Sequence, residues 1–139
     1  MAAAGLGMLA LAGVRPAAAA ALEPLLVDDP YVFEDVVDAL QPPALMLAWD
    51  DPWLEAGPGR PTIGPCIYTA RLRVICCAPR LMPGSGVDEL ERLVSYVLAR
   101  MRADSYAWAL DRVSSPEQVT SSGIDMLRAE VTYTITTTA

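Results

Sequence analysis

The residues that could carry out chemistry in this sequence are carboxylates, cysteines and serines, because it contains no histidine and no lysine. Histidine is the usual general base and the commonest metal ligand, and lysine supplies the amine of P-loops and of Schiff bases. Sites that depend on a catalytic or metal-binding histidine, a P-loop lysine or a Schiff-base lysine are therefore excluded. The 17 acidic residues leave open an acid–base pair made of carboxylates alone. Their adjacent pairs, however, lie in turn-like sequence where we expect solvation: Asp28-Asp29, Glu34-Asp35 and Asp50-Asp51.

Ser85 lies between two glycines, but the segment Gly84-Ser85-Gly86 is too short to be the turn that presents a catalytic serine. It stands directly before a helical pattern, and serine is a preferred N-cap residue. We therefore predict that Ser85 caps the helix and that Asp88 completes a capping box with it. No catalytic residue, cofactor-binding residue or metal ligand is predicted, and we expect the protein not to be an enzyme.

The three cysteines, Cys66, Cys76 and Cys77, do not suit a metal site. Such a site needs a second cysteine pair or histidines at ligand spacing, and the sequence has neither. Adjacent residues of a strand point to opposite faces, so Cys76 and Cys77 are not expected to point inward together. We predict that the cysteines act as small buried hydrophobic residues in a protein of a reducing compartment.

Length and composition predict one folded domain that spans residues 1–139. The chain is 53% hydrophobic and 19% charged, which provides enough apolar surface for a core. Its formal net charge of −7 argues against nucleic-acid binding, which depends on clustered basic residues. From Glu23 to Glu55 the sequence contains nine acidic residues and no basic one. This segment is either a solvated acidic face or the lining of a channel through which DNA slides without adhering.

An Ala-rich segment, residues 1–15, precedes the first predicted helix. Its apolar run from Leu6 to Val14 is too short to cross a bilayer, which takes about 20 residues. The run resembles a signal peptide poorly, since the charged n-region is missing and Arg15 follows it. We therefore expect no membrane anchor. A secreted domain that loses the segment before Leu22 remains an alternative.

Helical spacing of apolar residues predicts two helices. The first spans 17–27, where alanine has the best helix propensity. Its inner side is expected to carry Ala18, Leu22, Leu25 and Leu26. The second spans 87–101, with an apolar stripe of Val87, Leu90, Leu93, Val94, Val97, Leu98 and Met101. In this helix Asp88 and Arg92 stand four residues apart and are expected to pair.

Four strands are predicted, over residues 44–49, 66–77, 106–113 and 126–136. Two of them alternate clearly, and their inward residues are Tyr68, Ala70, Leu72, Val74 and Cys76 in one and Leu127, Ala129, Val131, Tyr133 and Ile135 in the other. The segment 31–37 is equally compatible with a short helix and a strand. Residues 50–65, rich in proline and glycine, are predicted to form a long projecting loop.

This order of elements predicts an α+β fold, with an antiparallel-rich sheet and two helices packed on one face. An Ala-rich helix, the run Pro42-Pro43-Ala44-Leu45-Met46-Leu47, a strand, the 87–101 helix and a final Thr-rich strand follow in that order. Together they resemble the tail terminator proteins of long-tailed phages, with siphophages of actinobacteria as the nearest group. The resemblance covers the chain from about Pro16 onward. It rests on element order and on the Pro-Pro-apolar strand, without a catalytic motif.

The resemblance implies a virion protein at the tail–head junction, present in the host cytoplasm during assembly. Six copies would form a ring that caps the tail tube, ends its growth and joins the tail to the head–tail connector. The implied partners are further copies of the chain, the tail tube protein and the connector (stopper) protein. DNA would pass through the lumen without specific binding, and no membrane would be involved. Another phage neck or minor capsid protein, a secreted small actinobacterial domain, and an enzyme that uses only carboxylates remain alternatives.

The 50–65 loop is predicted to contact a neighbouring component, because loops of this length in a compact domain are often functional. Trp53 and Leu54 are the expected anchors, since an exposed tryptophan beside an apolar neighbour is typical of interface centres. The expected polar rim consists of Asp50, Asp51, Glu55 and Arg60. In the alternative arrangement Trp53 folds back over the edge of the sheet.

Overall fold

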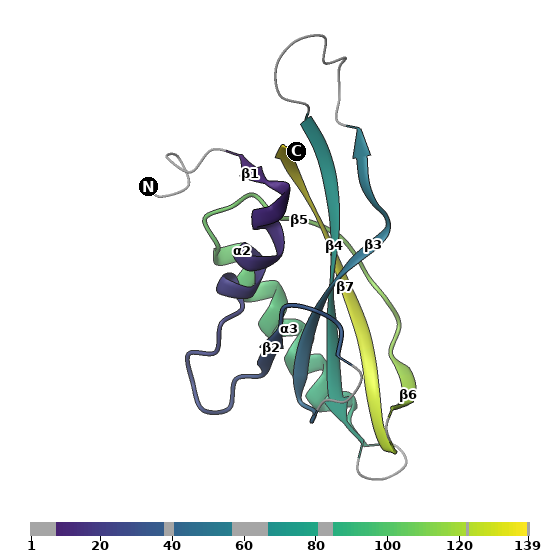
Figure 1. The fold of residues 1–139 in the computed structure, drawn as a ribbon. Coiled ribbons are helices and arrows are strands. Elements are labelled where there is room, and N and C mark those ends of the chain that lie inside the picture. The colour runs from purple at the N-terminus through teal and green to yellow at the C-terminus, as the bar shows by residue number, and fades with distance from the viewer. Residues whose placement is uncertain (1–7, 38–40, 57–66, 81–84, 122, 139) are drawn as a thin grey trace.

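The structure is a computed structural model that describes residues 8–37, 41–56, 67–80, 85–121 and 123–138 (Figure 1). Within these residues the chain forms seven strands, two α-helices and a short 3-10 helix. In chain order they are β1 (Leu9–Ala10), η1 (Leu11–Gly13), α2 (Val14–Ala21), β2 (Tyr31–Phe33), β3 (Ala44–Ala56), β4 (Ile67–Pro79), α3 (Val87–Ala103), β5 (Ala109–Val113), β6 (Glu117–Ser121) and β7 (Ile124–Thr138).

The strands form one mixed sheet centred on β4 and β7, which pair antiparallel over the whole length of β4. β3 pairs antiparallel with the other edge of β4, and β5 and β6 pair antiparallel with the other edge of β7. The short strands β1 and β2 pair parallel, with β7 and β3 respectively. Mixed α and β content is thus confirmed, but the expected antiparallel-rich sheet is wrong: the sheet is mixed and strands dominate. The parallel strands have only two and three residues, too few for a sequence pattern.

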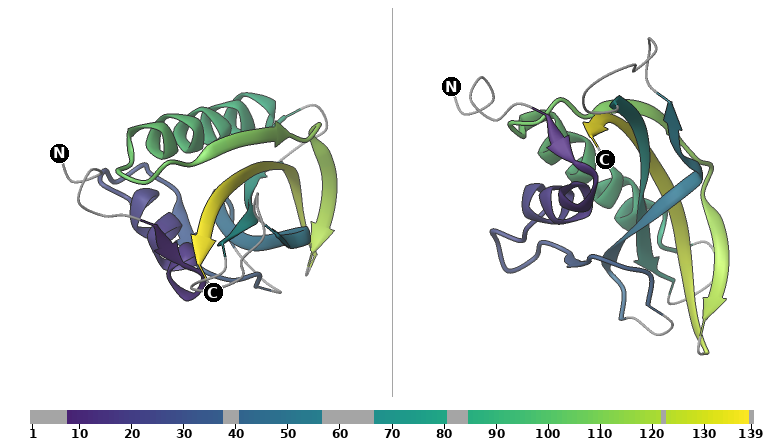
Figure 2. Two further views of the ribbon diagram at one scale, coloured as in Figure 1. Left: turned by 90° about the horizontal axis from the view of Figure 1, so that it is seen from above. Right: turned by 45° about the horizontal axis from the view of Figure 1, so that its top comes forward.

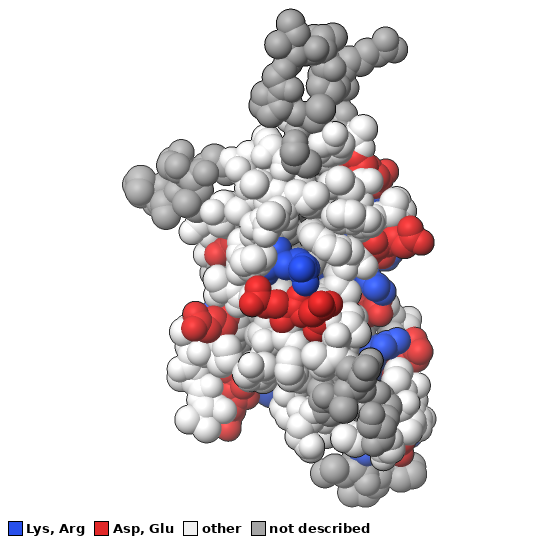
Figure 3. Space-filling view, in the orientation of Figure 1, with Lys and Arg blue, Asp and Glu red and all other residues white. Residues whose placement is uncertain are grey.

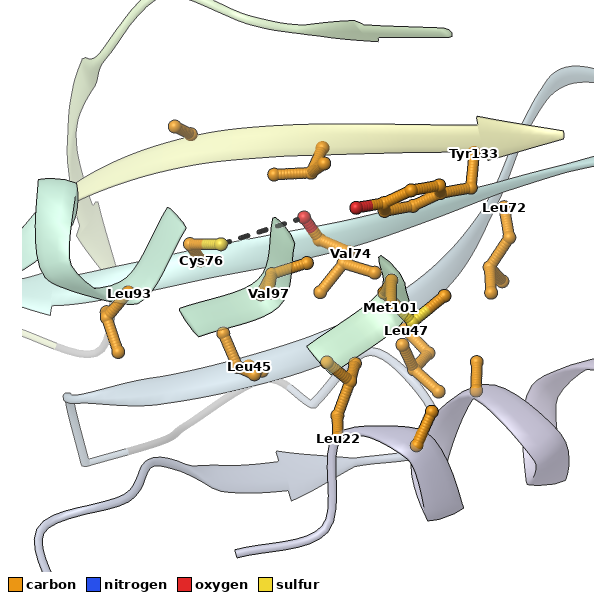
Figure 4. Close-up of a cluster of buried hydrophobic side chains, with 14 of the residues drawn as sticks. Leu22, Leu45, Leu47, Leu72, Val74, Cys76, Leu93, Val97, Met101 and Tyr133 are labelled. Carbon is orange, nitrogen blue, oxygen red and sulfur yellow. Dashed lines mark hydrogen bonds between the residues drawn. The ribbon is translucent and has the colours of Figure 1, made fainter. Parts of the chain in front are cut away.

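Both helices lie on one side of the sheet and share its main core (Figure 1). The buried residues of α3 are Leu90, Leu93, Val97 and Met101, so the predicted stripe of this helix is confirmed at its centre. They pack against the inward residues of β3, β4 and β7, as Figure 4 shows for Leu45, Leu72 and Tyr133. The alternation predicted for the strands is also confirmed, because the five inward residues predicted for β7 are all buried.

The other face of the sheet has a smaller core of its own. Seen from above, the sheet is strongly curved (Figure 2), and a second cluster of buried residues lies on the face away from the helices. Its members are Ala44, Met46, Ala48, Ile75, Cys77 and Met126. Cys76 belongs to the main core and Cys77 to this second cluster. The two cysteines point to opposite faces as predicted, yet both are buried because both faces are covered.

The buried thiols should be unreactive in the folded protein. Burial raises the pKa of Cys76 to about 12 and that of Cys77 to about 11, so almost no thiolate is present at pH 8, and the thiolate is the reactive form. Cys66 lies outside the described residues and is replaced by serine in the test. We expect the native Cys66→Ser variant not to react with an aromatic disulfide reagent, and the denatured variant to react with two equivalents per chain. Rapid reaction of the native variant would show that one of the two faces of the sheet is open to the reagent.

The first helix is shorter than predicted. α2 ends at Ala21, with Leu22 as its C-cap, instead of continuing to Val27. The reason is Pro24, which lacks a backbone N–H and disfavours helical geometry at Glu23. Ala18 and Leu22 are buried as expected, but Leu25 and Leu26 are exposed.

The start of α3 also differs from the prediction. Gly86, not Ser85, is the N-cap, with φ of 97°. A Cβ atom there would lie 2.8 Å from the carbonyl oxygen of Pro79, so both backbone conformation and space require glycine. Arg92 pairs with Glu89, three residues before it, rather than with Asp88.

Three strand predictions need correction. The segment 31–37, which was compatible with a helix or a strand, contains β2. The strand predicted over 106–113 begins only at Ala109, and β6 had not been predicted because its sequence, Glu117–Ser121, has no apolar alternation. The predicted strand 44–49 is confirmed, but β3 continues to Ala56. The first part of the predicted 50–65 loop is therefore strand, and residues 57–65 lie outside the described residues.

Candidate subunit interfaces

The residues predicted to form an interface do not make one exposed patch. Arg60 lies outside the described residues, and the other five lie on β3. Between Trp49 and Leu54 the pairing of β3 with β4 shifts, so that residues 50–53 form a bulge. A bulge can hold Pro52, which has no N–H to give to a ladder. Asp50 follows Trp49, which packs against the main core, so by strand alternation it faces the outer side of the sheet, where its side chain is only 9% exposed.

Asp50 belongs to a charged cluster that crosses four neighbouring strands on the face away from the helices. The cluster consists of Asp50 and Glu55 of β3, Arg71 and Arg73 of β4, Asp111 and Arg112 of β5, and Glu130 of β7. The carboxylate of Asp50 accepts a hydrogen bond from Arg112 at 3.0 Å. The guanidinium of Arg71 lies 3.6 Å from Asp50 and donates to both Glu55 and Asp111.

The charged cluster is best explained as a clamp that joins the strands. Asp111 stands at a second irregularity, where the register of β5 against β7 shifts between Leu110 and Arg112, and its carboxylate accepts a hydrogen bond from Arg71. Each of the four carboxylates contacts an arginine, which leaves none as the unpaired base of an acid–base pair. Where the described acids have a clearly shifted pKa, at Asp29 and Glu89, hydrogen bonds lower it.

Trp53 packs against the protein itself. Its ring lies 4.9 Å from that of Trp49, and the residue is 41% exposed. Leu54 points to the helix side and packs against the main core, while Glu55 contacts Arg71. Trp53 thus lies beside Trp49 of its own strand with part of its surface still open, and its role as an interface anchor stays a prediction. Asp51 is exposed at the bulge.

The outer edge of β3 is poorly suited to pairing with a strand of another chain. In the described residues β2 pairs only with the beginning of β3, from Ala44 to Met46. The rest of that edge carries the bulge, Pro52 and the acidic residues Asp51 and Glu55. Bulges, prolines and charges are the features by which proteins prevent edge-to-edge pairing. An interface has to be sought in exposed side chains instead.

One exposed apolar surface lies on the segment between α2 and β2, which stands out from the body of the molecule (Figure 1). Leu25 is 74% exposed, Leu26 72% and Val27 completely. We call these three residues the apolar loop. Single exposed apolar residues are common on protein surfaces, but three consecutive ones on a projecting turn are not expected to serve the monomer. The sequence signal for this turn was Pro24 together with Asp28-Asp29-Pro30.

Asp29 holds the apolar loop in shape. Its carboxylate accepts hydrogen bonds from the backbone N–H groups of Leu25 and Leu26, both at 2.8 Å. The N–H of Asp29 in turn donates to the carbonyl oxygen of Leu26 at 3.1 Å. The two backbone hydrogen bonds lower the pKa of Asp29, so the carboxylate is charged throughout the neutral range. The loop is therefore ordered before it meets any partner.

A second exposed apolar surface lies between the end of α3 and β5. It is a hollow of about 320 Å³ lined by Leu98, Arg102, Trp108, Leu110 and Tyr133, which we call the groove. The indole N–H of Trp108 donates to the carboxylate of Asp104 at 2.7 Å, which fixes this wall of the groove. Leu110 at its rim is 53% exposed. A stiff aromatic wall with apolar neighbours is typical of a docking site.

The acidic run of the sequence does not form one continuous face. Asp50 and Glu55 face arginines of the charged cluster, on the side of the sheet away from the helices. Asp29 lies on the helix side, within the electrostatic influence of Arg92 and Arg100 of α3. On the face seen in Figure 3, acidic side chains are scattered and several have a basic neighbour. The distribution favours local pairing and solvation of these acids.

Among the described residues no group of three or more cysteines or carboxylates is placed to hold a metal ion. Neither described α-helix is both long and apolar enough to cross a membrane. No protein-family model matches the sequence, and no curated protein is significantly similar to it. The function is therefore inferred from the molecule itself.

Proposed function

We propose that this chain is a structural subunit of a long-tailed phage. Six copies form a ring that caps the tail tube, ends its growth and joins the tail to the head–tail connector. The observation that carries the proposal is the presence of two ordered, exposed apolar surfaces, the apolar loop and the groove, at separate places on one small domain. A subunit that must touch two neighbours needs two such surfaces.

The order of elements supports the same role. An N-terminal helix, a Pro-Pro-initiated strand, an amphipathic helix and a Thr-rich last strand are the features that resemble tail terminator proteins, and α2, β3, α3 and β7 occur in that order. The net charge of −7 suits a ring through which DNA passes without being held. Its partners are further copies of the chain, the tail tube protein and the connector protein, in the virion.

The packing of the N-terminal region argues against a secreted domain cleaved before Leu22. Val14 and Ala18 of α2 are fully buried in the main core. The hydroxyl of Thr137 in β7 donates to the carbonyl oxygen of Leu9 at 2.7 Å. Cleavage would remove these buried side chains and one edge strand, and would leave a cavity under the sheet.

Deleting the gene from the phage that carries it tests the proposal. Without the ring nothing stops the tail tube from growing or attaches it to the head, so we expect separate heads and tails of irregular, excessive length in electron micrographs of the lysate. Supplying the protein in trans should restore joined particles. Tails of normal length that fail to join would indicate another neck protein, and normal virions would contradict the proposal.

A further inference from the structure

The apolar loop and the groove lie on opposite flanks of α3. The hydroxyl of Tyr96 donates to the carbonyl oxygen of Leu22 at 2.8 Å, which places the segment leading into the loop beside this flank of the helix. Leu98, which lines the groove, follows Tyr96 by two residues, a rotation of about 200° around the helix. The chain leaving α3 turns back alongside it into β5, as the left view of Figure 2 shows. One copy therefore cannot bring its own loop into its own groove.

The chemistry of the two surfaces is complementary. The apolar loop offers aliphatic side chains at its tip, and the groove offers Leu98, Leu110 and the indole of Trp108. The loop is bordered by the exposed acids Glu23 and Asp28. The lining of the groove contains Arg102, and the acid next to the groove wall, Asp104, is already hydrogen-bonded to the indole of Trp108. Matching of apolar to apolar and of negative to positive groups fixes how two surfaces meet.

We infer that the apolar loop of one copy docks into the groove of a second copy, with Val27 at the contact. This inference rests on the proposed ring and names its subunit contact. The contact joins two different surfaces, so it is a head-to-tail contact that leaves one loop and one groove free at the ends of any open chain. Repetition closes into a ring if the rotation between copies allows it and otherwise extends as a filament.

Order in the loop favours this contact. Because Asp29 already holds the backbone of Leu25 and Leu26, little conformational entropy is lost when the loop docks. The groove is likewise fixed by the hydrogen bond between Trp108 and Asp104. Two rigid and complementary surfaces bind more tightly than flexible ones of equal area.

A charge placed on either surface should strongly weaken self-association of the purified chain. Val27→Asp places a charge at the tip of the loop, and Leu110→Asp places one at the rim of the groove. We expect wild type to self-associate with a dissociation constant of about 1 mM or lower. The dissociation constant of each variant should be at least about 30-fold higher, as for truncation of an interface hot spot. Light scattering after size-exclusion chromatography measures the self-association of wild type and of each variant. Val87→Asp, the same substitution at the exposed start of α3, should associate like wild type.

Mixing the two variants tests the head-to-tail geometry. The Leu110→Asp chain keeps an intact loop and the Val27→Asp chain an intact groove, so the mixture should form a dimer and stop there. Circular dichroism should show that both variants are folded. A monomeric wild type, unimpaired association of either variant, or a mixture that stays monomeric would each overturn the inference.

The gene-deletion phenotype separates this inference from the proposed function. If deletion gives overlong, unattached tails but the mixed variants stay monomeric, the chain is a tail terminator whose subunits meet elsewhere. If the mixture dimerises but deletion leaves virions normal, the chain self-associates head to tail and the proposed role in the phage is wrong.

Discussion

Leu93→Ala should destabilise the folded protein by about 2 to 5 kcal/mol. Leu93 is fully buried in the main core, where α3 packs against the sheet (Figure 4). Removing its side chain loses the transfer free energy of the deleted carbons and leaves a cavity that the three long strands cannot collapse to fill. Urea denaturation followed by circular dichroism gives the free energy of unfolding, and the melting temperature should fall by on the order of 10 °C.

Leu98→Ala is the matched control, because it makes the same change on the same helix. Leu98 is only half-buried and lines the groove, so its truncation should cost clearly less stability than that of Leu93. If Leu98→Ala were the more destabilising of the two, the inner face of α3 would be wrongly placed and the groove would belong to the core.

Asp50→Ala should cost about 1 to 3 kcal/mol, because it removes the acceptor that three arginines share. Asp50 is almost enclosed, while Arg71 and Arg73 are less than a third exposed, so water replaces the lost carboxylate only in part. The like charges of Arg71 and Arg73 on β4 and of Arg112 on β5 would then repel one another. Chemical denaturation of the variant measures the loss, which salt should partly relieve by screening the repulsion.

Asp51→Ala provides the comparison for Asp50→Ala. Asp51 is the next residue in the same bulge and has the same charge, but it is exposed. Its replacement should change the free energy of unfolding by no more than about 0.5 kcal/mol. Equal effects of the two substitutions would mean that the charged cluster does not clamp the strands, and that Asp50 acts only through the net charge.

The elements with strong periodicity were predictable from the sequence. The stripe of α3 and the alternation of β4 and β7 each span ten or more residues and correspond to buried faces in the structure. Short elements were not predictable, because β1 and β2 owe their pairing to β7 and β3 rather than to any pattern of their own. In the same way, the burial of Cys77 depends on a second core that forms only when Met46 and Met126 come together.

Interactions with residues distant in the sequence could not be predicted either. Residues 50–56 contain Pro52 and three acids and so resemble a loop, but Arg71, Arg73 and Arg112 neutralise Asp50 and Glu55 and keep the segment in the sheet. The predicted anchor Trp53 therefore lies on a strand beside Trp49. The apolar loop was missed for the opposite reason: Leu25 and Leu26 have helical spacing, and Pro24 outweighs it.

Cryo-electron microscopy of the virion tests the central claim most directly. The proposed role predicts that a phage virion containing this chain has, at the junction of tail and head, a closed ring of six copies, in which the apolar loop of each copy lies in the groove of the next. The described sheet and helices should fit this density without rearrangement of α3. A single copy at the junction, a position elsewhere in the particle, or absence of the chain from the virion would contradict the account.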